Sequence, residues 1–366
     1  MSTQDQRRSI TGAISGYVLR LARESIPLTQ AEFAELLEGD VRTVQGWESG
    51  RRPLANMRAG ALLDLTRRLL ALGADQNLVR LLDPAMDADR IIGAALDPPA
   101  DHREHPLSEW VHNRETAHMI AWAVNGTCPP AVGNRPKAAR RGPVADAPLL
   151  PAGERTALFA HLREMAEQTA RTASNGILLR RQVLYLTSYD RSPDAASWTA
   201  HALHRQRGVL SVRGWSMHWA EGRSIATALA RHGDPQPLRD FIDRSLADDD
   251  MGEAANLNYW AYWLGALPAT QVDDRFMAKR SLPEWDAITL MRRLTQGMKE
   301  APTYADLYAH SVWALLTACP WLPQAEPATA KVLMAHTVIT LDENDLSSRS
   351  RRELGAVHQL LRGERA

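Results

Sequence analysis

Apolar residues recur along most of this chain at intervals of three and four, the spacing that places side chains on one face of an α-helix. Ile14, Val18 and Leu21 share one face in the first such segment. No stretch alternates with the period of two that a half-buried strand would show. The pattern predicts an all-α protein, with later helices at roughly 86–96, 107–124, 154–172, 175–189, 194–206, 212–231, 236–247, 252–266, 284–299, 303–318, 325–340 and 345–362.

Prolines and glycines interrupt this pattern most densely at residues 126–153. Six of the 21 prolines lie within 23 residues there, and each removes a backbone donor and disfavours helix in the residue before it. The segment also carries more basic than acidic residues: Arg135, Lys137, Arg140 and Arg141 against Asp146. We expect a mobile basic linker, for which contact with phosphate groups and a purely solubilising role both stay open.

The chain is thus predicted to have an N-terminal domain at 1–73 and a helical connector at 74–125. The linker separates these from a larger helical domain at 154–366. A length of 366 residues fits two or three domains at roughly 100–200 residues each. Antiparallel helix pairs of this size would suit an α-solenoid, but no signature repeats along the chain. A repeat-like architecture therefore stays an open alternative for the C-terminal domain.

Composition excludes several classes of protein. Hydrophobic residues make up 45% and charged residues 23%, which is typical of globular proteins and not of disordered or collagen-like chains. The 43 basic and 43 acidic side chains cancel, so binding to nucleic acid would need a local basic patch. Two cysteines, a polar start without a secretory core and the lack of a long apolar stretch predict a cytoplasmic protein without membrane spans.

Residues 29–49 contain the clearest local motif. Thr29 and Glu32 form a capping box that begins a short helix, Gln30 to Leu37, with Phe33, Ala34 and Leu37 facing inward. Gly39 is expected to supply the backbone freedom of a tight turn. Asp40 then caps a second helix, Val41 to Ser49, with Val44 and Trp47 facing inward. Two short helices joined by a three-residue turn predict a helix-turn-helix, whose second helix enters the major groove of DNA.

The residues of this motif resemble the Cro/C1-type (XRE) family of bacterial and phage DNA-binding domains, in particular its actinobacterial branch. The resemblance covers about 65 residues and rests on Thr29-Gln30-x-x-Phe33-Ala34-x-x-Leu37, then Thr43-Val44-x-x-Trp47-Glu48-x-Gly50-Arg51-Arg52-Pro53, with the preceding helix around Leu19–Glu24. One departure lies in the turn: Glu38 and Gly39 stand where the family usually has glycine and then a small aliphatic residue.

The resemblance implies which residues meet DNA. Base contacts are expected from residues at the start of each motif helix: Gln30, Val41, Arg42, Gln45 and Gly46. Arginine can grip guanine, glutamine can grip adenine, and valine can touch a thymine methyl group. Phosphate contacts are expected from hydroxyl and guanidinium groups around them: Thr29, Thr43, Arg51, Arg52 and Arg58. Residues 42–58 hold four arginines and one acid, Glu48, so they form a local basic patch that would make binding salt-dependent.

Two further residues of the motif are assigned to the fold. Trp47 is predicted to be a core residue because Phe33 and Val44 beside it are apolar. Glu48 is predicted to pair with a nearby arginine.

The sequence gives no sign of catalysis or of a cofactor. His102 and His105, and His201 and His204, have a spacing that metal ligands use, but neither pair has a matching second pair. Cys128 and Cys319 stand alone, and no phosphate-binding, dinucleotide, zinc-protease or hydrolase motif is present. We expect no enzyme activity, no metal site and no cofactor.

Aromatic residues gather in the C-terminal domain. Trp198, Tyr262 and Trp285 accompany five that are candidates for an effector pocket or a dimer contact: Trp215, Trp219, Tyr259, Trp260 and Trp263. The alternative is core packing between helices. Glu253, Asn256 and Asn258 lie near them in sequence and would give a pocket its polar groups.

These observations predict a sequence-specific regulator of transcription that binds double-stranded DNA. A single small helix-turn-helix rarely binds tightly alone, so we expect a homodimer on an inverted repeat, located with the nucleoid. Two alternatives remain: a regulator gated by a small molecule, a peptide or a partner protein, similar in layout to quorum-sensing regulators, and a phage or plasmid maintenance protein that binds DNA.

Overall fold

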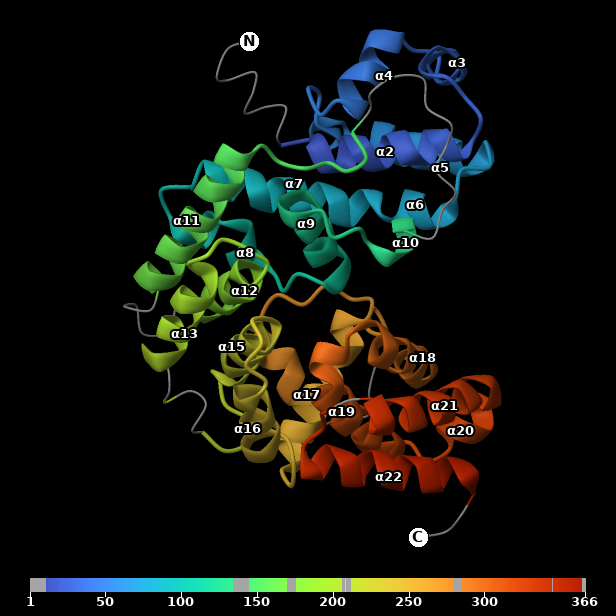
Figure 1. Cartoon of the computed structure of the whole chain (residues 1–366). Coiled ribbons are helices and arrows are strands. Elements are labelled where there is room, and N and C mark those ends of the chain that lie inside the picture. Colours follow the sequence, from blue (N-terminus) through green and yellow to red (C-terminus); the bar gives the residue numbers. More distant parts are fainter. Residues whose placement is uncertain are drawn as a thin grey trace. The chain divides into compact units, whose positions relative to one another are not determined.

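The computed structural model describes residues 11–133, 145–169, 176–205, 208, 212–279, 285–343 and 345–363. Within these ranges the chain is built from helices joined by turns, and no strand occurs (Figure 1). The predicted all-α fold is therefore confirmed. No helix in the same ranges combines the length and the apolar character that crossing a membrane requires.

The chain forms two compact units that interleave in sequence. Unit 1 comprises Met1–Pro106 and Arg114–Glu164, and unit 2 comprises Leu107–Asn113 and Met165–Ala366. The predicted N-terminal domain and most of the helical connector thus belong to one unit, whereas Leu107–Asn113 of the connector belong to the other. The predicted helix at 107–124 is interrupted, because residues 110–113 are not helical and the short segment before Arg114 belongs to unit 2.

Unit 1 is formed by short and medium-length helices. They are α2 (Ala13–Ser25), α3 (Gln30–Leu36), α4 (Val41–Glu48), α5 (Ala59–Ala71), α6 (Gln76–Arg80), α7 (Leu82–Leu96), α9 (Arg114–Asn125) and α10 (Pro130–Gly133), with the 3-10 turns η1 (Leu54–Asn56) and η2 (His102–Glu104). α8 (Pro106–Glu109) and α11 (Ala152–Thr169) contain the points where the chain passes between units. α2 packs on α7, and α7 packs on α9.

A buried carboxylate holds the start of α2. Asp89 of α7 is 1% exposed, and its two oxygens accept from the backbone amides of Ile14 and Ser15 at 3.0 and 2.9 Å. These amides belong to the first turn of α2, where no intrahelical acceptor exists. Removal from water raises the pKa of Asp89 to about 6, although the hydrogen bonds from Ser15 and Ile14 oppose the shift.

The predicted linker is partly folded at its two ends. α10 lies inside it, and Leu150 is buried while its amide donates to the carbonyl of Ala123 at 2.9 Å. Residues 134–144 lie outside the described residues, including the basic positions Arg135, Lys137, Arg140 and Arg141. The prediction of a mobile basic segment therefore concerns residues of which the structure gives no description.

Unit 2 is a larger helical body with one extensive core. Its helices are α12 (Ile177–Thr187), α13 (Ala195–Arg205), α15 (Trp219–Arg231), α16 (Gln236–Ser245), α17 (Asp250–Trp263), α18 (Ala287–Glu300), α19 (Ala305–Ala318), α20 (Leu322–Ala325), α21 (Pro327–Glu343) and α22 (Ser348–Arg362), with η3 (Asp274–Ala278) and η4 (Pro302–Tyr304). α15 is buried from Trp219 to Ala230 without a break, so it is the central helix of this unit.

Two predicted helices of unit 2 differ from the observed ones. The helix predicted at 212–231 begins only at Trp219, because residues 212–216 form no helix. The helix predicted at 325–340 corresponds to α21, which begins at Pro327, and the short α20 that precedes it was not predicted. Proline lacks the amide that would continue a helix, which explains the boundary there.

Candidate nucleic-acid interface

The first motif helix, α3, begins with the predicted capping box. The Thr29 hydroxyl accepts from the amide of Glu32 at 3.2 Å, and the Glu32 carboxylate accepts from the amide of Thr29 at 2.7 Å. Hydrogen bonds to its carboxylate from the Thr29 backbone and from the Thr29 side chain lower the pKa of Glu32. Phe33 and Ala34 are buried as predicted, whereas Leu37 is half-buried and lies just beyond the last helical residue.

The turn between α3 and α4 differs from the prediction in one respect. Glu38, not Gly39, has the left-handed conformation, with a φ of 55°. The amide of Glu38 donates to the Glu35 carbonyl and the amide of Gly39 to the Ala34 carbonyl, both at 2.9 Å. This is the Schellman ending of a helix, in which the residue after the cap is left-handed and is usually glycine. The glutamate therefore occupies the position that favours glycine, and the prediction that Gly39 provides the turn was wrong.

The second motif helix, α4, has a mixed inner face. Asp40 caps it by accepting from the Arg42 amide at 2.8 Å. Val44 is 1% exposed and Glu48 is 8% exposed, whereas Trp47 is only half-buried. The prediction that Trp47 is a core residue was wrong, because the inner face follows the four-residue step from Val44 to Glu48.

A buried polar network explains that inward glutamate. Arg23 of α2 holds Glu48 through two hydrogen bonds, Nε to Oε1 at 2.6 Å and Nη2 to Oε2 at 3.0 Å. The Gln30 side-chain amide of α3 donates to the same Glu48 Oε2 at 2.7 Å, and Arg23 Nη1 donates to the Leu28 carbonyl at 2.6 Å. The prediction that Glu48 pairs with an arginine is confirmed. The network joins three helices and fixes the orientation of α4 against α2.

A close backbone approach reinforces this arrangement. A Cβ atom added to Gly16 of α2 would collide with the carbonyl oxygen of Trp47 in α4. Only glycine allows the two helices to lie this near to each other. The position of α4 is thus determined by side chains and backbone together.

The predicted base-contacting residues of α4 differ in their exposure to solvent. Arg42 and Gln45 are exposed, and Val41 is half-buried. Gly46 is buried, because the side chain of Arg52 lies across it: a Cβ atom there would be 3.0 Å from Arg52 Cδ. In this conformation Gly46 therefore offers no free surface to a base, unlike Arg42 and Gln45.

The predicted phosphate-contacting arginines are exposed and surround the end of α4. Arg52 Nη1 donates to the Thr43 hydroxyl at 3.0 Å, and Arg51 Nε donates to the Ser49 hydroxyl at 3.1 Å. Arg58 is exposed at the start of α5. Neither these three nor Arg42 forms an ion pair with any carboxylate of the described residues, so their charges are not neutralised within that part of the chain.

Thr29 and Gln30 already have partners within the protein. The Thr29 oxygen accepts from the Glu32 amide in the capping box, and the Thr29 side chain also bonds to the Glu32 carboxylate. The Gln30 amide nitrogen gives one of its two hydrogens to Glu48 and keeps the other. At the beginning of α3, Gln30 therefore keeps a donor for a phosphate oxygen, whereas the Thr29 side chain is engaged with Glu32.

Three residues that position this surface were not singled out from the sequence. Arg23, Gly16 and Asp89 act through contacts with residues distant in the chain, so no local pattern identifies their roles.

The aromatic candidates of unit 2 are mainly part of its core. Trp219, Tyr259 and Trp260 are at most 4% exposed, and Trp215 and Trp263 are half-buried against the same core. Burial leaves the first three no surface to offer a second copy in this conformation, so the dimer-contact interpretation fails for them. A cavity of about 600 Å³ lies elsewhere, between α18 and α21, and none of the five aromatic residues lines it.

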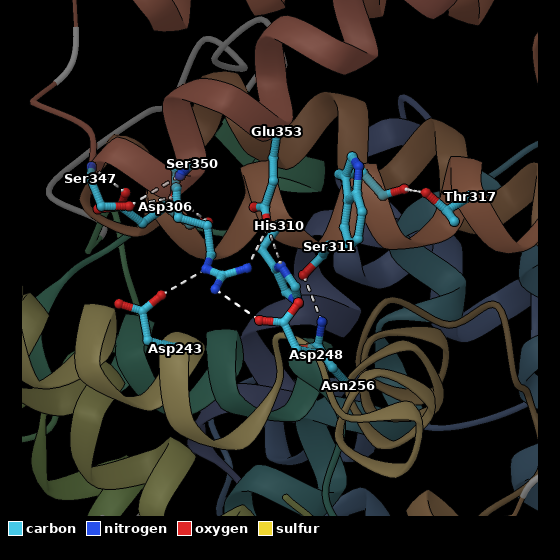
Figure 2. A network of polar contacts seen from close by, with 12 residues as sticks. Asp243, Asp248, Asn256, Asp306, His310, Ser311, Thr317, Ser347, Ser350 and Glu353 are labelled. Carbon is cyan, nitrogen blue, oxygen red and sulfur yellow. Dashed lines mark hydrogen bonds and ion pairs between the residues drawn. The ribbon is translucent and has the colours of Figure 1, made fainter. Parts of the chain in front are cut away.

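A second polar network joins the C-terminal helix to the core of unit 2. Arg349 of α22 donates to Asp243 at 2.8 Å and to Asp248 at 3.0 Å (Figure 2). On the same helix, Glu353 contacts Nδ1 of the buried His310 ring at 3.1 Å.

The same region links this network to the aromatic core. Asn256, one of the predicted polar neighbours of the aromatic residues, donates to the Ser311 hydroxyl at 2.9 Å (Figure 2). Trp260 Nε1 donates to the same hydroxyl at 2.8 Å. Asn258 donates to the carbonyls of Met277 and Lys279, both at 2.9 Å. The side-chain nitrogens of Asn256 and Asn258 thus bond to the protein itself.

The part of the chain that the structure describes contains no candidate metal-binding site. No group of three histidine, cysteine or carboxylate side chains is close enough there to hold an ion. Burial raises the pKa of the thiols of Cys128 and Cys319, which makes both less nucleophilic.

Comparison with models of known protein families, with curated proteins and with solved structures found no match for this chain.

Proposed function

We propose that this chain is a sequence-specific, double-stranded DNA-binding regulator of transcription of the Cro/C1-type (XRE) kind, with α4 as its recognition helix in the major groove. The observation that supports this most directly is the outward start of α4. Arg42 and Gln45 are exposed there, and these two residue types recognise guanine and adenine by paired hydrogen bonds.

The fixed orientation of α4 also favours this function. Reading bases requires that a helix enter the groove in one register. The contacts from Arg23 and Gln30 to Glu48 provide such a constraint from the inner side of α4. The outer side stays open to a ligand.

The exposed arginines around α4 are suited to contact the DNA backbone. Arg51, Arg52 and Arg58 border α4 without carboxylate partners among the described residues. Guanidinium groups in this position would bind phosphates and set the register of the protein on DNA. A neutral protein with a local basic patch would bind DNA through this patch alone.

We further propose that the protein acts as a homodimer on an inverted repeat. One helix-turn-helix reads few base pairs, and two copies related by a twofold axis would place two recognition helices about one turn of DNA apart. Unit 2 would provide the dimer contact or respond to an effector. The protein would act in the cytoplasm, on the bacterial nucleoid.

Capture and sequencing of genomic DNA fragments on the purified full-length protein tests this proposal. The key variant is Val41→Ala/Arg42→Ala/Gln45→Ala, which changes only outward side chains of α4. Arg67→Ala is a matched control, because it also removes one exposed arginine of unit 1. We expect the wild type and the control to enrich one inverted-repeat motif at about 150 mM salt, and the triple variant to lose it.

A second measurement separates base contacts from phosphate contacts. Arg51→Ala/Arg52→Ala/Arg58→Ala should keep the motif but bind it more weakly, and the slope of log affinity against log salt should fall by about 0.9 per lost contact. If no motif is enriched, or if the triple variant of α4 enriches the same motif as the wild type, the proposed recognition helix is wrong.

A further inference from the structure

Four arginines of unit 2 lie on two packed helices, α12 and α15, three of them buried and the fourth half-buried. Two of them have carboxylate partners. Arg180 donates from Nε and Nη2 to the two oxygens of Glu221, with Nη2 at 2.7 Å. Arg181 uses the same two nitrogens toward Asp274, with Nε at 2.7 Å. Both pairs are forks in which one edge of the guanidinium meets one planar carboxylate.

The third arginine, Arg223, lacks such a partner. It is 5% exposed on α15, and its Nε and Nη2 have no hydrogen-bond partner among the described residues. These are the same two nitrogens that Arg180 and Arg181 use to hold a carboxylate. The edge of Arg223 is thus buried and ready to donate.

Two aromatic rings contact this guanidinium. The central carbon of Arg223 lies 3.9 Å from the ring centre of Tyr259 and 4.7 Å from that of Trp260. Cation–π contacts of this kind compensate part of a buried charge but bind none of its hydrogens. The rings therefore leave Nε and Nη2 without an acceptor among the described residues.

The fourth arginine, Arg231, adds to the positive charge. It donates to the hydroxyls of Ser188 and Tyr185, and its central carbon lies 4.3 Å from the ring centre of Tyr189. No described carboxylate bonds to it. The group of four arginines therefore has two carboxylate partners within the described part of unit 2, and two positive charges stay uncompensated.

An unpaired buried charge is costly for a protein. The pKa of Arg223 is lowered by its removal from water, although nearby phenol groups, that of Tyr259 first, oppose the shift. A residue that only filled space between Tyr259 and Trp260 would be better replaced by an uncharged side chain. Its charge and its orientation need another explanation.

We propose that the Nε–Nη2 edge of Arg223 binds the carboxylate group of a small molecule inside unit 2. The two paired arginines beside it show the geometry, a planar carboxylate in the plane of the guanidinium. By analogy with these two forks, the proposed ligand group is a carboxylate and not a phosphate. Arg231 contributes further positive charge to the same interior. This inference does not depend on the DNA-binding proposal.

Thermal unfolding of the full-length protein tests the site. The probes are sodium acetate, sodium benzoate and inorganic phosphate, each compared with chloride at equal ionic strength. Arg223→Met removes the charge and keeps the apolar bulk, and Arg223→Lys keeps the charge but not the two-nitrogen edge. Arg275→Met is the matched control, since it removes an exposed arginine of unit 2.

We expect acetate or benzoate to raise the melting temperature of the wild type and of Arg275→Met in a saturable way. Direct titration calorimetry of the same carboxylate should give at least tenfold weaker binding to Arg223→Lys and none to Arg223→Met. If Arg223→Met does not fold, Arg223→Lys alone decides the result.

Three outcomes would overturn the inference. The first is a carboxylate effect equal in wild type and Arg223→Lys, which would be a general salt effect. The second is stabilisation by phosphate alone, and the third is no stabilisation by any probe. None of these measurements involves DNA, so they leave the DNA-binding proposal untouched.

Discussion

Arg23 in unit 1 and Arg223 in unit 2 are both buried arginines, but their surroundings differ. Arg23 is 7% exposed and gives three of its nitrogens to Glu48 and a backbone carbonyl. Arg223 is 5% exposed and contacts two rings, and no carboxylate of the described residues bonds to it. A buried charge supports a fold only when an opposite charge and hydrogen bonds accompany it. The first arginine is therefore structural, and the second is better explained by binding.

The largest expected effect comes from breaking the pair in unit 1. Glu48→Gln keeps the shape of the side chain but leaves the charge of Arg23 uncompensated, so we expect unit 1 to lose about 3 kcal/mol or more of its unfolding free energy. Native-state hydrogen exchange of the α2, α3 and α4 amides measures this locally, which is necessary because the chain has two compact units.

The matched change in unit 2 sharpens the comparison. Arg223→Met should leave the exchange of α15 and α17 unchanged or slower, since it removes a buried charge without orphaning a partner. The double variant Arg23→Met/Glu48→Met should recover most of the stability that Glu48→Gln loses. A loss in Arg223→Met as large as that in Glu48→Gln would show that both arginines are structural.

The same comparison explains how much the sequence could predict. The capping box and the two short helices around it follow from local preferences, and their pattern of apolar residues was visible in the chain. The inward Glu48 was predictable only as a partner of some arginine. Trp47 was placed wrongly, because an ion pair with a helix 25 residues away outweighed the apolar pattern.

Long-range contacts account for what was missed. The left-handed Glu38 stands next to a glycine that looked like the natural turn residue. Asp89 reaches α2 across about 75 residues, and Arg223 meets Tyr259 and Trp260 only after folding. No periodicity of three or four can specify such partners, because it records which face is buried and not what that face touches.

The next effect in size is a pH dependence of unit 1. Burial raises the pKa of Asp89 from an ordinary value of 3.8 to about 6. Between these values the folded state binds more protons than the unfolded state, so this group lowers stability as pH rises through the window. At about 1.4 kcal/mol per pKa unit, its contribution should change by up to about 3 kcal/mol between pH 4 and pH 7.

Asp89→Asn isolates this contribution. Asparagine has one acceptor oxygen for the two amides of α2 but carries no buried charge, so any loss of stability should be largest at low pH and should shrink as pH rises. The variant should also lack the slope between pH 4 and 6 that wild type shows in hydrogen exchange of α2. Equal slopes in the two proteins would mean that Asp89 does not titrate in this window.

A smaller effect is expected in unit 2 at Arg349 (Figure 2). Its aspartate partners are more than half exposed, and solvent screens such pairs, so Arg349→Ala should cost about 1 kcal/mol or less. The loss should appear as faster hydrogen exchange of α22 and should shrink at high salt. Arg352→Ala, an exposed arginine of the same helix, should change neither; equal effects would assign the result to helix propensity.

The smallest effect should be a gain in stability at the turn before α4. Glu38 has a φ of 55°, a conformation that costs a residue with a Cβ about 1–2 kcal/mol and glycine little. Glycine also loses more backbone entropy on folding, so Glu38→Gly should stabilise unit 1 by about 0.5–1 kcal/mol. Gly39→Ala is the matched comparison: its backbone is not left-handed, so it should not destabilise the turn. A loss in Glu38→Gly would show that the glutamate side chain stabilises the turn through contacts of its own.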